Sequence, residues 1–259
     1  MERTFLLSLE FDGTDFCGWQ RQSEGRSVQL VMEAAVSRLA GAPRTVIGAG
    51  RTDAGVHALA MPASVVMPSR WTPSRLLQAL NSVLPRDLAV REVREAVPGT
   101  DARRSALSRQ YRYDIAEDGS GRSPFAARTL WPLGRPLDLA AMEAATAALP
   151  GRHDCRAFAV TGEPKPHYDC TIAEARWERL APARLRFHIR ADRFLHRMVR
   201  LLVGTLVDVG LGRRPADDVT RLLALRHNAE TSAPAPAAGL TFVAAAYPDT
   251  CFPGERATW

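Results

Sequence analysis

The sequence contains almost no lysine. Lys165 is the only lysine among the 34 lysine and arginine residues of this 259-residue chain, so nearly all of the positive charge is arginine. With 28 acidic residues the net charge is +6, which favours an anionic partner. Arginine offers a rigid fork for phosphate oxygens and a flat face that stacks on bases. The composition therefore indicates an RNA partner more than a membrane surface.

Cysteine and long apolar runs are scarce as well. The four cysteines are too few for a disulfide framework in a chain of this length, which agrees with a reducing compartment. No apolar run approaches the roughly 18 residues that span a bilayer. The N-terminal segment has no basic stretch followed by a long apolar one. We therefore expect a cytoplasmic protein with no membrane partner.

Recognisable metal-ligand spacings are also missing. His153-x-Cys155 and His167-x-x-Cys170 supply four residues of the types that bind zinc. Their spacings, however, fit no common structural or deaminase site. Scattered histidines and buried cysteines explain them better, so we expect no metal.

The first half of the chain reads as a β-α-β-β-α-β unit. Ser27 is a suitable N-cap and Gly41 a suitable stop for its first helix. The predicted strands cover 3–11, 45–49, 58–67 and 88–97, and the predicted helices cover 28–39 and 72–82. This order is typical of the ferredoxin-like fold, an antiparallel sheet with both helices on one face and the other face free.

The second half has the same classes of element in a different order. Its predicted strands cover 108–116, 171–180, 184–191 and 240–247, and its predicted helices cover 137–149, 194–209 and 215–226. Pro98-Gly99 marks the boundary between the halves. We predict an α+β protein of two ferredoxin-like or RRM-like domains, 1–102 and 103–259. Mixed, mainly antiparallel sheets are expected to meet at a central basic cleft.

The segment 46–58 sets a carboxylate beside a guanidinium in a glycine-rich turn that follows an apolar strand. Its glycines can take positive φ and carry no Cβ, so a planar or phosphate-bearing partner could approach the backbone closely. Asp53 is then the reactive group and Arg51 its neighbour. On the residues alone, an Asp that caps the turn and a solvated arginine fit equally well.

Arg200 lies in a predicted helix that is apolar on most of its circumference. A buried guanidinium needs an anion, so we expect a carboxylate from elsewhere in the fold, either an ordinary ion pair or Asp53 itself. Arg193 and Arg197 are expected near the same helical face and could reach phosphates. Solvated side chains are the alternative for both.

The segment Arg109-Gln-Tyr-Arg-Tyr113 lies on a predicted strand. Period-two alternation puts Arg109, Tyr111 and Tyr113 on one face. A tyrosine on an open sheet face can stack on a base, although most strand tyrosines belong to the core.

Several of these segments resemble one family. Gly-Arg-Thr-Asp-Ala-Gly-Val-His-Ala at 50–58 resembles the catalytic motif of the tRNA pseudouridine synthase A family, and segments 194–200 and 109–113 resemble its Phe-Leu-x-x-Met-Val-Arg and Arg-x-Tyr-x-Tyr motifs. Landmarks at 11–22, 80–85 and 235–240 extend the resemblance over nearly the whole chain. Two segments depart from the pattern: 100–103 replaces Phe-His-Ala-Arg, and 230–234 lacks the usual Ala-Gly-x-Thr.

The resemblance implies an isomerase that converts uridine to pseudouridine at nucleotides 38, 39 and 40 of tRNA without a cofactor. It further implies a homodimer that binds the anticodon stem-loop and elbow of one tRNA across both subunits. The catalytic residues carried over are Asp53 (nucleophile or base), Arg51 and Arg200. The expected substrate-binding residues are Tyr111, Arg21, Gln22, Asn81, His57, Arg193 and Arg197. An ionised Asp53 suits attack on C1′, addition to the uracil ring, or removal of the C2′ proton.

Two other functions fit parts of the sequence. A non-catalytic protein that binds structured RNA could share the fold and the basic, aromatic sheet. The segment Glu10–Thr14 superficially resembles the nucleophile loop of haloacid-dehalogenase-like phosphatases, but Glu10 stands where their nucleophilic aspartate would be. Asp53 separates the first alternative from an enzyme, because a simple RNA binder gains nothing from a carboxylate that faces phosphates.

Overall fold

The computed structural model describes residues 1–160 and 167–253, so Lys165 lies outside the described residues. The chain divides into two compact units. The first comprises residues 1–109 together with the residues from 242 onward, and the second comprises residues 110–241. Two domains that divide at residue 102 stay a prediction, because compactness alone does not show that a unit folds independently.

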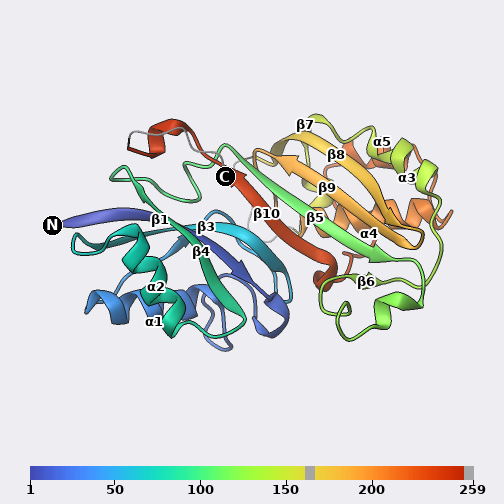
Figure 1. Ribbon diagram of the computed structural model, residues 1–259. Helices are drawn as coiled ribbons and strands as arrows, with labels where there is room; N and C mark the ends of the chain where they lie inside the picture. The colour runs from blue at the N-terminus through green and yellow to red at the C-terminus, as the bar shows by residue number, and fades with distance from the viewer. Residues whose placement is uncertain (161–166, 254–259) are drawn as a thin grey trace. The chain divides into compact units, whose positions relative to one another are not determined.

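The first unit is built on an antiparallel sheet with the predicted β-α-β-β-α-β order. Its elements are β1 (Glu2–Phe11), α1 (Val28–Ala40), β2 (Ile47–Gly48), β3 (His57–Pro68), α2 (Pro73–Val83) and β4 (Leu88–Ala96), with β10 (Leu240–Ala246) at the end of the chain. The strand order is β4-β1-β3, and both β2 and β10 pair with β3. Figure 1 shows α1 and α2 on the same side of these strands, as expected for a ferredoxin-like unit.

The local signals at the helix ends are confirmed. The side chain of Ser27 accepts a hydrogen bond from the backbone N–H of Leu30, and α1 ends at Gly41, whose φ of 76° is left-handed. The N-cap of α2 is Thr72, with proline at the next position.

The prediction that one face of this sheet is free is wrong. β1 is buried on both faces, and Leu6 and Leu7, which point to opposite sides, are each fully buried. The segment that follows β4 helps to cover the strands, because the backbone N–H of Ala102 donates to the hydroxyl of Ser64 on β3.

The second unit combines three helices with further strands of the sheet. Its elements are β5 (Ser108–Ala116), β6 (Trp131–Pro132), α3 (Leu139–Thr146), β7 (Gly151–Asp154), β8 (Asp169–Ala181), β9 (Arg184–Ala191), α4 (Met198–Gly210) and α5 (Asp218–Leu223). The strand order is β5-β9-β8-β7, with β6 parallel to β5. The indole N–H of Trp177 donates to the hydroxyl of Thr146 at 3.0 Å, which ties β8 to α3.

Five single-turn 3-10 helices complete the described structure. They are η1 (Gly13–Asp15), η2 (Gly119–Arg122), η3 (Arg156–Phe158), η4 (Ala237–Gly239) and η5 (Asp249–Cys251). The α+β class with a mixed, mainly antiparallel sheet is confirmed. Within the described ranges, no helix combines the length and hydropathy needed to cross a membrane.

The predicted helix 194–209 begins four residues later than expected. Arg197 has a φ of 59°, in the left-handed region, and α4 starts at Met198. The apolar periodicity continues through Phe194 and Leu195 although the backbone there is not helical, so periodicity alone misplaced the boundary. The other two helices of this unit, α3 and α5, are also shorter than predicted.

Candidate active site

The loop after β2 carries Asp53 in a tight turn. The carbonyl of Asp53 accepts the backbone N–H of Val56 at 3.2 Å, and Gly55 has a φ of 79°. The Asp53 side chain is half-buried, whereas Thr52 before it is buried. The turn therefore orients the carboxylate through the backbone on both sides of it.

The segment that follows η1 packs directly against this turn. The backbone N–H of Trp19 donates to the Thr52 carbonyl at 3.0 Å, and the N–H of Gly55 donates to the Phe16 carbonyl at 3.3 Å. A Cβ on Gly18 would lie 2.6 Å from the Thr52 carbonyl oxygen, so only glycine fits there. Gly18 also has a φ of 104°, which reinforces the requirement.

His57 supports the segment that packs against the same turn. Its Nδ1 accepts the backbone N–H of Gly13 at 3.0 Å and lies 3.2 Å from Oδ1 of Asp12. The His57 side chain is buried, and a Cβ on Gly13 would lie only 2.0 Å from the Val56 carbonyl oxygen. These contacts give His57 a role in holding the turn, while contact with substrate stays a prediction.

Arg109 is a residue of this site that the sequence reasoning did not select. Its guanidinium donates to three backbone carbonyls: Nε to Ala49 at 3.1 Å, Nη1 to Ala106 at 3.0 Å, and Nη2 to Arg103. Arg109 thus joins the start of the Asp53 loop to the turn before β5. The sequence signal that could have pointed to Arg109 was its predicted position on the same strand face as Tyr111.

Arg51 lies on the surface close to another arginine. Partial burial of the head group lowers the pKa of Arg51, and the positive charge of Arg103 lowers it further. A guanidinium stays charged at neutral pH, so this pair of like charges beside the loop is suited to an anion. The Asp101 side chain accepts the backbone N–H groups of Arg103 and Arg104, which gives the unusual segment 100–103 a well-defined turn.

The three remaining predicted residues of the first unit all have partners within it. Arg21 is exposed and its Nη1 lies 3.4 Å from Glu33. Gln22 is exposed and donates to the carbonyl of Cys17 at 3.2 Å. Both polar atoms of the Asn81 amide bind the backbone of Val90 at 2.8 Å, which fastens α2 to β4. Substrate binding by these three stays a prediction.

Tyr111 and Tyr113 lie on one face of β5, as period-two alternation predicts. Both are buried, whereas Arg112 between them is half-buried. The Tyr111 ring packs edge-to-face on Phe194, with ring centroids 5.0 Å apart. The Tyr113 hydroxyl donates to the carbonyl of Pro236 at 2.7 Å, which ties the strand to the connector before β10.

Arg200, in the first turn of α4, is half-buried rather than fully buried. Its Nε donates to the carbonyl of Ala235 at 2.7 Å, and the Ala235 N–H donates back to the Arg200 carbonyl at 2.9 Å. Burial raises the pKa of Tyr113, and the positive charge of Arg200 opposes that rise. Arg200 is therefore held by the connector, and pairing with Asp53 stays a prediction.

Arg193 and Arg197 do not share a helical face with Arg200, because both precede α4. Arg193 places its Nη1 3.0 Å from Nε2 of His167. Arg197 is exposed, and it is the N-cap residue of α4 with a left-handed backbone conformation. The prediction of one basic helical face is wrong, and phosphate binding by these two side chains stays a prediction.

The histidines and cysteines that were considered as zinc ligands lie partly together. His153 and Cys170 are paired across β7 and β8. Among the residues that the structure describes, no group of three or more His, Cys, Asp or Glu side chains is arranged to hold a metal ion.

Comparison with known proteins identifies the class of enzyme. A family model described as tRNA pseudouridine synthase matches residues 8–99 and 145–248. The tRNA pseudouridine synthase A of Thermus thermophilus is 43% identical, covering 95% of this chain and 98% of the relative. That of Rhodospirillum centenum is also 43% identical, over 93% and 98%. That of Syntrophotalea carbinolica is 38% identical, over 96% and 98%.

The sequence likeness to these enzymes, on an α+β fold, defines the class of this protein as an RNA-modifying isomerase. The chain belongs to the tRNA pseudouridine synthase family. A solved structure titled as an unknown protein from Galdieria sulphuraria is 16% identical and covers 84% of this chain and 93% of its own, but its TM-score of 0.25 is too low to compare the folds.

Proposed function

We propose that this enzyme converts uridine to pseudouridine at nucleotides 38, 39 and 40 of the tRNA anticodon stem-loop, with Asp53 as the essential carboxylate. Family membership supports the reaction and the tRNA substrate. The likeness of segment 50–58 to the catalytic motif supports the choice of Asp53. The observation that carries the proposal is the tight turn that Gly13, Gly18 and His57 brace around this carboxylate.

The reaction needs the target base outside its stack. Arg51 would then hold the displaced nucleotide. The positive charge of Arg103 near Arg51 supports the binding of an anionic group at this position. Tyr111 would stack on the uracil, and Arg200 would keep Asp53 ionised and oriented. Asp53 would drive cleavage of the N-glycosidic bond, so that the base rotates and rejoins the ribose through carbon.

The remaining predicted residues are assigned to RNA binding outside the reacting base. Arg21, Gln22, Arg193 and Arg197 offer exposed or half-exposed polar groups that can contact the backbone. We further propose a cytoplasmic homodimer that binds one tRNA across both subunits. His57 and Asn81 would act by holding the loop and α2 in place, in line with the hydrogen bonds that they make.

Position-specific mapping tests the proposal. Wild-type enzyme is incubated with unmodified tRNAs that carry uridine at 38, 39 or 40, and pseudouridine is mapped by carbodiimide treatment and primer extension. We expect stops at these three positions only. Stops elsewhere in the tRNA would refute the proposed positions but not the reaction. RNA binding without any stop would favour the non-catalytic alternative.

A further inference from the structure

Two polar side chains of α1, those of Gln29 and Glu33, contact both the segment that follows η1 and the strand that leads to Asp53. They lie four residues apart on the helix, and Nε2 of Gln29 donates to Oε1 of Glu33 at 3.1 Å. The Glu33 side chain is only 11% exposed, so its carboxylate needs polar partners. Neither residue was predicted to bind RNA or to take part in catalysis.

The pair holds the residue just before β2. Oε1 of Glu33 accepts the backbone N–H of Val46 at 3.2 Å, and Nε2 of Gln29 donates to the Val46 carbonyl at 3.1 Å. Val46 itself is fully buried. Both polar backbone atoms of the residue from which the chain enters β2 and the Asp53 loop are therefore fixed by α1.

The same pair holds the segment that carries Arg21. The carbonyl of Trp19 accepts the backbone N–H of Gln29 at 3.0 Å, and Oε1 of Gln29 accepts the backbone N–H of Arg21 at 3.2 Å. The second carboxylate oxygen of Glu33, Oε2, lies 3.4 Å from Nη1 of Arg21. Each oxygen of Glu33 thus contacts a different segment, Oε1 the strand and Oε2 the arginine.

Arg21 can bind a phosphate while it contacts Glu33. A guanidinium has several N–H donors, and the long contact with Glu33 occupies one of them. The Arg21 side chain is 65% exposed, so its remaining donors are accessible to a phosphate oxygen. A long side chain loses rotamer freedom when it binds RNA, and a contact that already restricts the side chain reduces this loss.

We infer that Glu33 is a positioning residue of the reaction, with a separate role for each oxygen. Oε2 holds the Arg21 guanidinium ready for a phosphate of the tRNA backbone. Oε1, together with Gln29, holds Val46 and with it the entry to the Asp53 loop. The inference rests on the functions proposed for Arg21 and Asp53. A purely electrostatic effect has the opposite sign, because a carboxylate repels RNA and its removal should strengthen binding.

Glu33→Gln and Glu33→Ala separate the two roles. The amide oxygen of Glu33→Gln can still accept the N–H groups of Val46 and Gln29, but the side chain has no charge for Arg21. Glu33→Ala loses both sets of contacts. Fluorescence anisotropy measures tRNA affinity, and the single-turnover rate at saturating tRNA measures the placement of Asp53.

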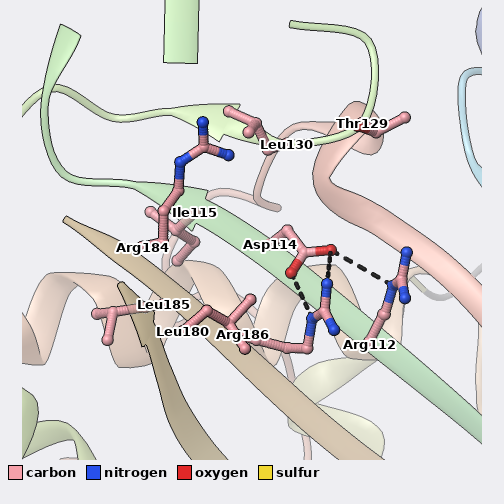
Figure 2. A pocket seen from close by; sticks show the side chains of 9 residues that line it. All are labelled: Arg112, Asp114, Ile115, Thr129, Leu130, Leu180, Arg184, Leu185 and Arg186. Atoms are coloured by element: carbon pink, nitrogen blue, oxygen red, sulfur yellow. Dashed lines mark hydrogen bonds and ion pairs between the residues drawn. The ribbon is translucent and has the colours of Figure 1, made fainter. Parts of the chain in front are cut away.

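Asp114→Asn is the matched control. The Asp114 side chain is 13% exposed, close to the value for Glu33, and it pairs with Arg186 at 2.6 Å in the second unit (Figure 2). The control therefore also removes one negative charge from a half-buried pair with an arginine. Asp114→Asn should keep or raise tRNA affinity.

Glu33→Gln should lower tRNA affinity by about threefold to tenfold, as expected when one phosphate contact is weakened. Glu33→Ala should lower affinity to the same extent and also lower the single-turnover rate by about tenfold, more than Glu33→Gln does. Arg21→Gln should weaken binding as Glu33→Gln does, and the double variant should bind no more weakly than Arg21→Gln alone. Melting temperatures confirm folding, and Glu33→Gln keeps the inference testable if Glu33→Ala is too unstable.

Three results would contradict parts of this account. Wild-type or higher affinity in Glu33→Gln, with weaker binding by Arg21→Gln, would overturn the inference and leave the RNA contact of Arg21 intact. Unchanged affinity in Arg21→Gln would overturn both the inference and that contact. A wild-type rate in folded Glu33→Ala would overturn the role of Oε1. Absence of pseudouridine with the wild type would instead contradict the proposed function.

Discussion

The loop that carries Asp53 and the segment that leads to Arg200 are fixed in different ways. Backbone atoms hold the loop from several sides, and glycines 13 and 18 allow approaches that a Cβ would block. The segment 192–197 instead contains a non-glycine residue, Arg197, in the left-handed region. The loop around Asp53 depends on glycines that lack a Cβ. The segment 192–197 instead keeps the long side chain of Arg197 at a conformational cost.

The difference indicates what each region contributes. A reacting carboxylate has to be placed within a few tenths of an ångström, and rigid backbone contacts achieve this. Arginines that bind the RNA backbone need reach and charge more than exact placement. Substitutions in the loop should therefore change the rate, whereas substitutions in the arginine segment should change affinity.

Gly13→Ala should have the largest effect among the predictions that probe the loop scaffold. Its Cβ would lie 2.0 Å from the Val56 carbonyl oxygen, so the turn after Asp53 must shift. We expect at least about a hundredfold loss of pseudouridine formation, since misplacement by 1 Å can have that effect, and destabilisation by about 1–3 kcal/mol. Gly119→Ala is the control, because nothing lies within 4 Å of its added Cβ. Equal rates for the two variants would contradict the account.

Arg109→Lys tests whether the Asp53 loop depends on its anchor. A lysine cannot reproduce the three-carbonyl contact of the guanidinium, so the loop should lose part of its support. We expect about a tenfold lower single-turnover rate, equivalent to about 1.4 kcal/mol, with tRNA affinity within about threefold. Arg70→Lys is the control, since Arg70 also binds backbone carbonyls, those of Leu39 and Ala40, but away from the loop. A similar rate for both variants would show that the Asp53 loop does not depend on Arg109.

Arg197→Gly tests the second region, the segment 192–197 that leads to Arg200. Glycine adopts the φ of 59° without the cost of about 1 kcal/mol that a side chain incurs there. If the arginine is retained for RNA, tRNA affinity should fall about threefold to tenfold while the single-turnover rate at saturating tRNA stays the same. Fluorescence anisotropy with labelled tRNA measures the first quantity. Unchanged tRNA affinity would show that Arg197 does not contribute to RNA binding.

Asp87→Asn should have the smallest effect, and one that depends on pH. Arg26 binds Asp87 at 2.5 and 2.7 Å, and these hydrogen bonds lower the pKa of Asp87. The pair therefore stabilises the folded state fully above the ordinary carboxyl pKa of about 3.9 and loses this effect as pH falls through the lowered folded-state value. Urea unfolding should show a deficit of about 0.5–1 kcal/mol at pH 7 that shrinks as the pH falls below the ordinary carboxyl pKa of about 3.9. A deficit that stays constant as the pH falls would point to another cause.

Local sequence signals predicted most of the fold. The bounds of β5 and β9 and the caps of α1 were correct, because alternation and capping are properties of adjacent residues. The two-residue β6 was not predicted, because it depends on pairing with Ile115 of β5. The late start of α4 was missed because hydrophobic periodicity does not report the backbone angle of Arg197.

The candidate site was predictable only where a motif marks it. The segment around Asp53 stands out because its glycines and charges are unusual together. The anchoring contacts of Arg109 were not predicted, because its three acceptors are backbone carbonyls, which every residue carries.

The most direct test of the central claim compares wild type with Asp53→Ala and Asp53→Asn. Pseudouridine in tRNA is quantified by carbodiimide mapping after equal incubation, and tRNA affinity is measured for each protein. The account predicts pseudouridine with the wild type, none with either variant, and affinity that is equal or higher in the variants because a negative charge is removed. Identical pseudouridine profiles for wild type and Asp53→Ala would contradict it.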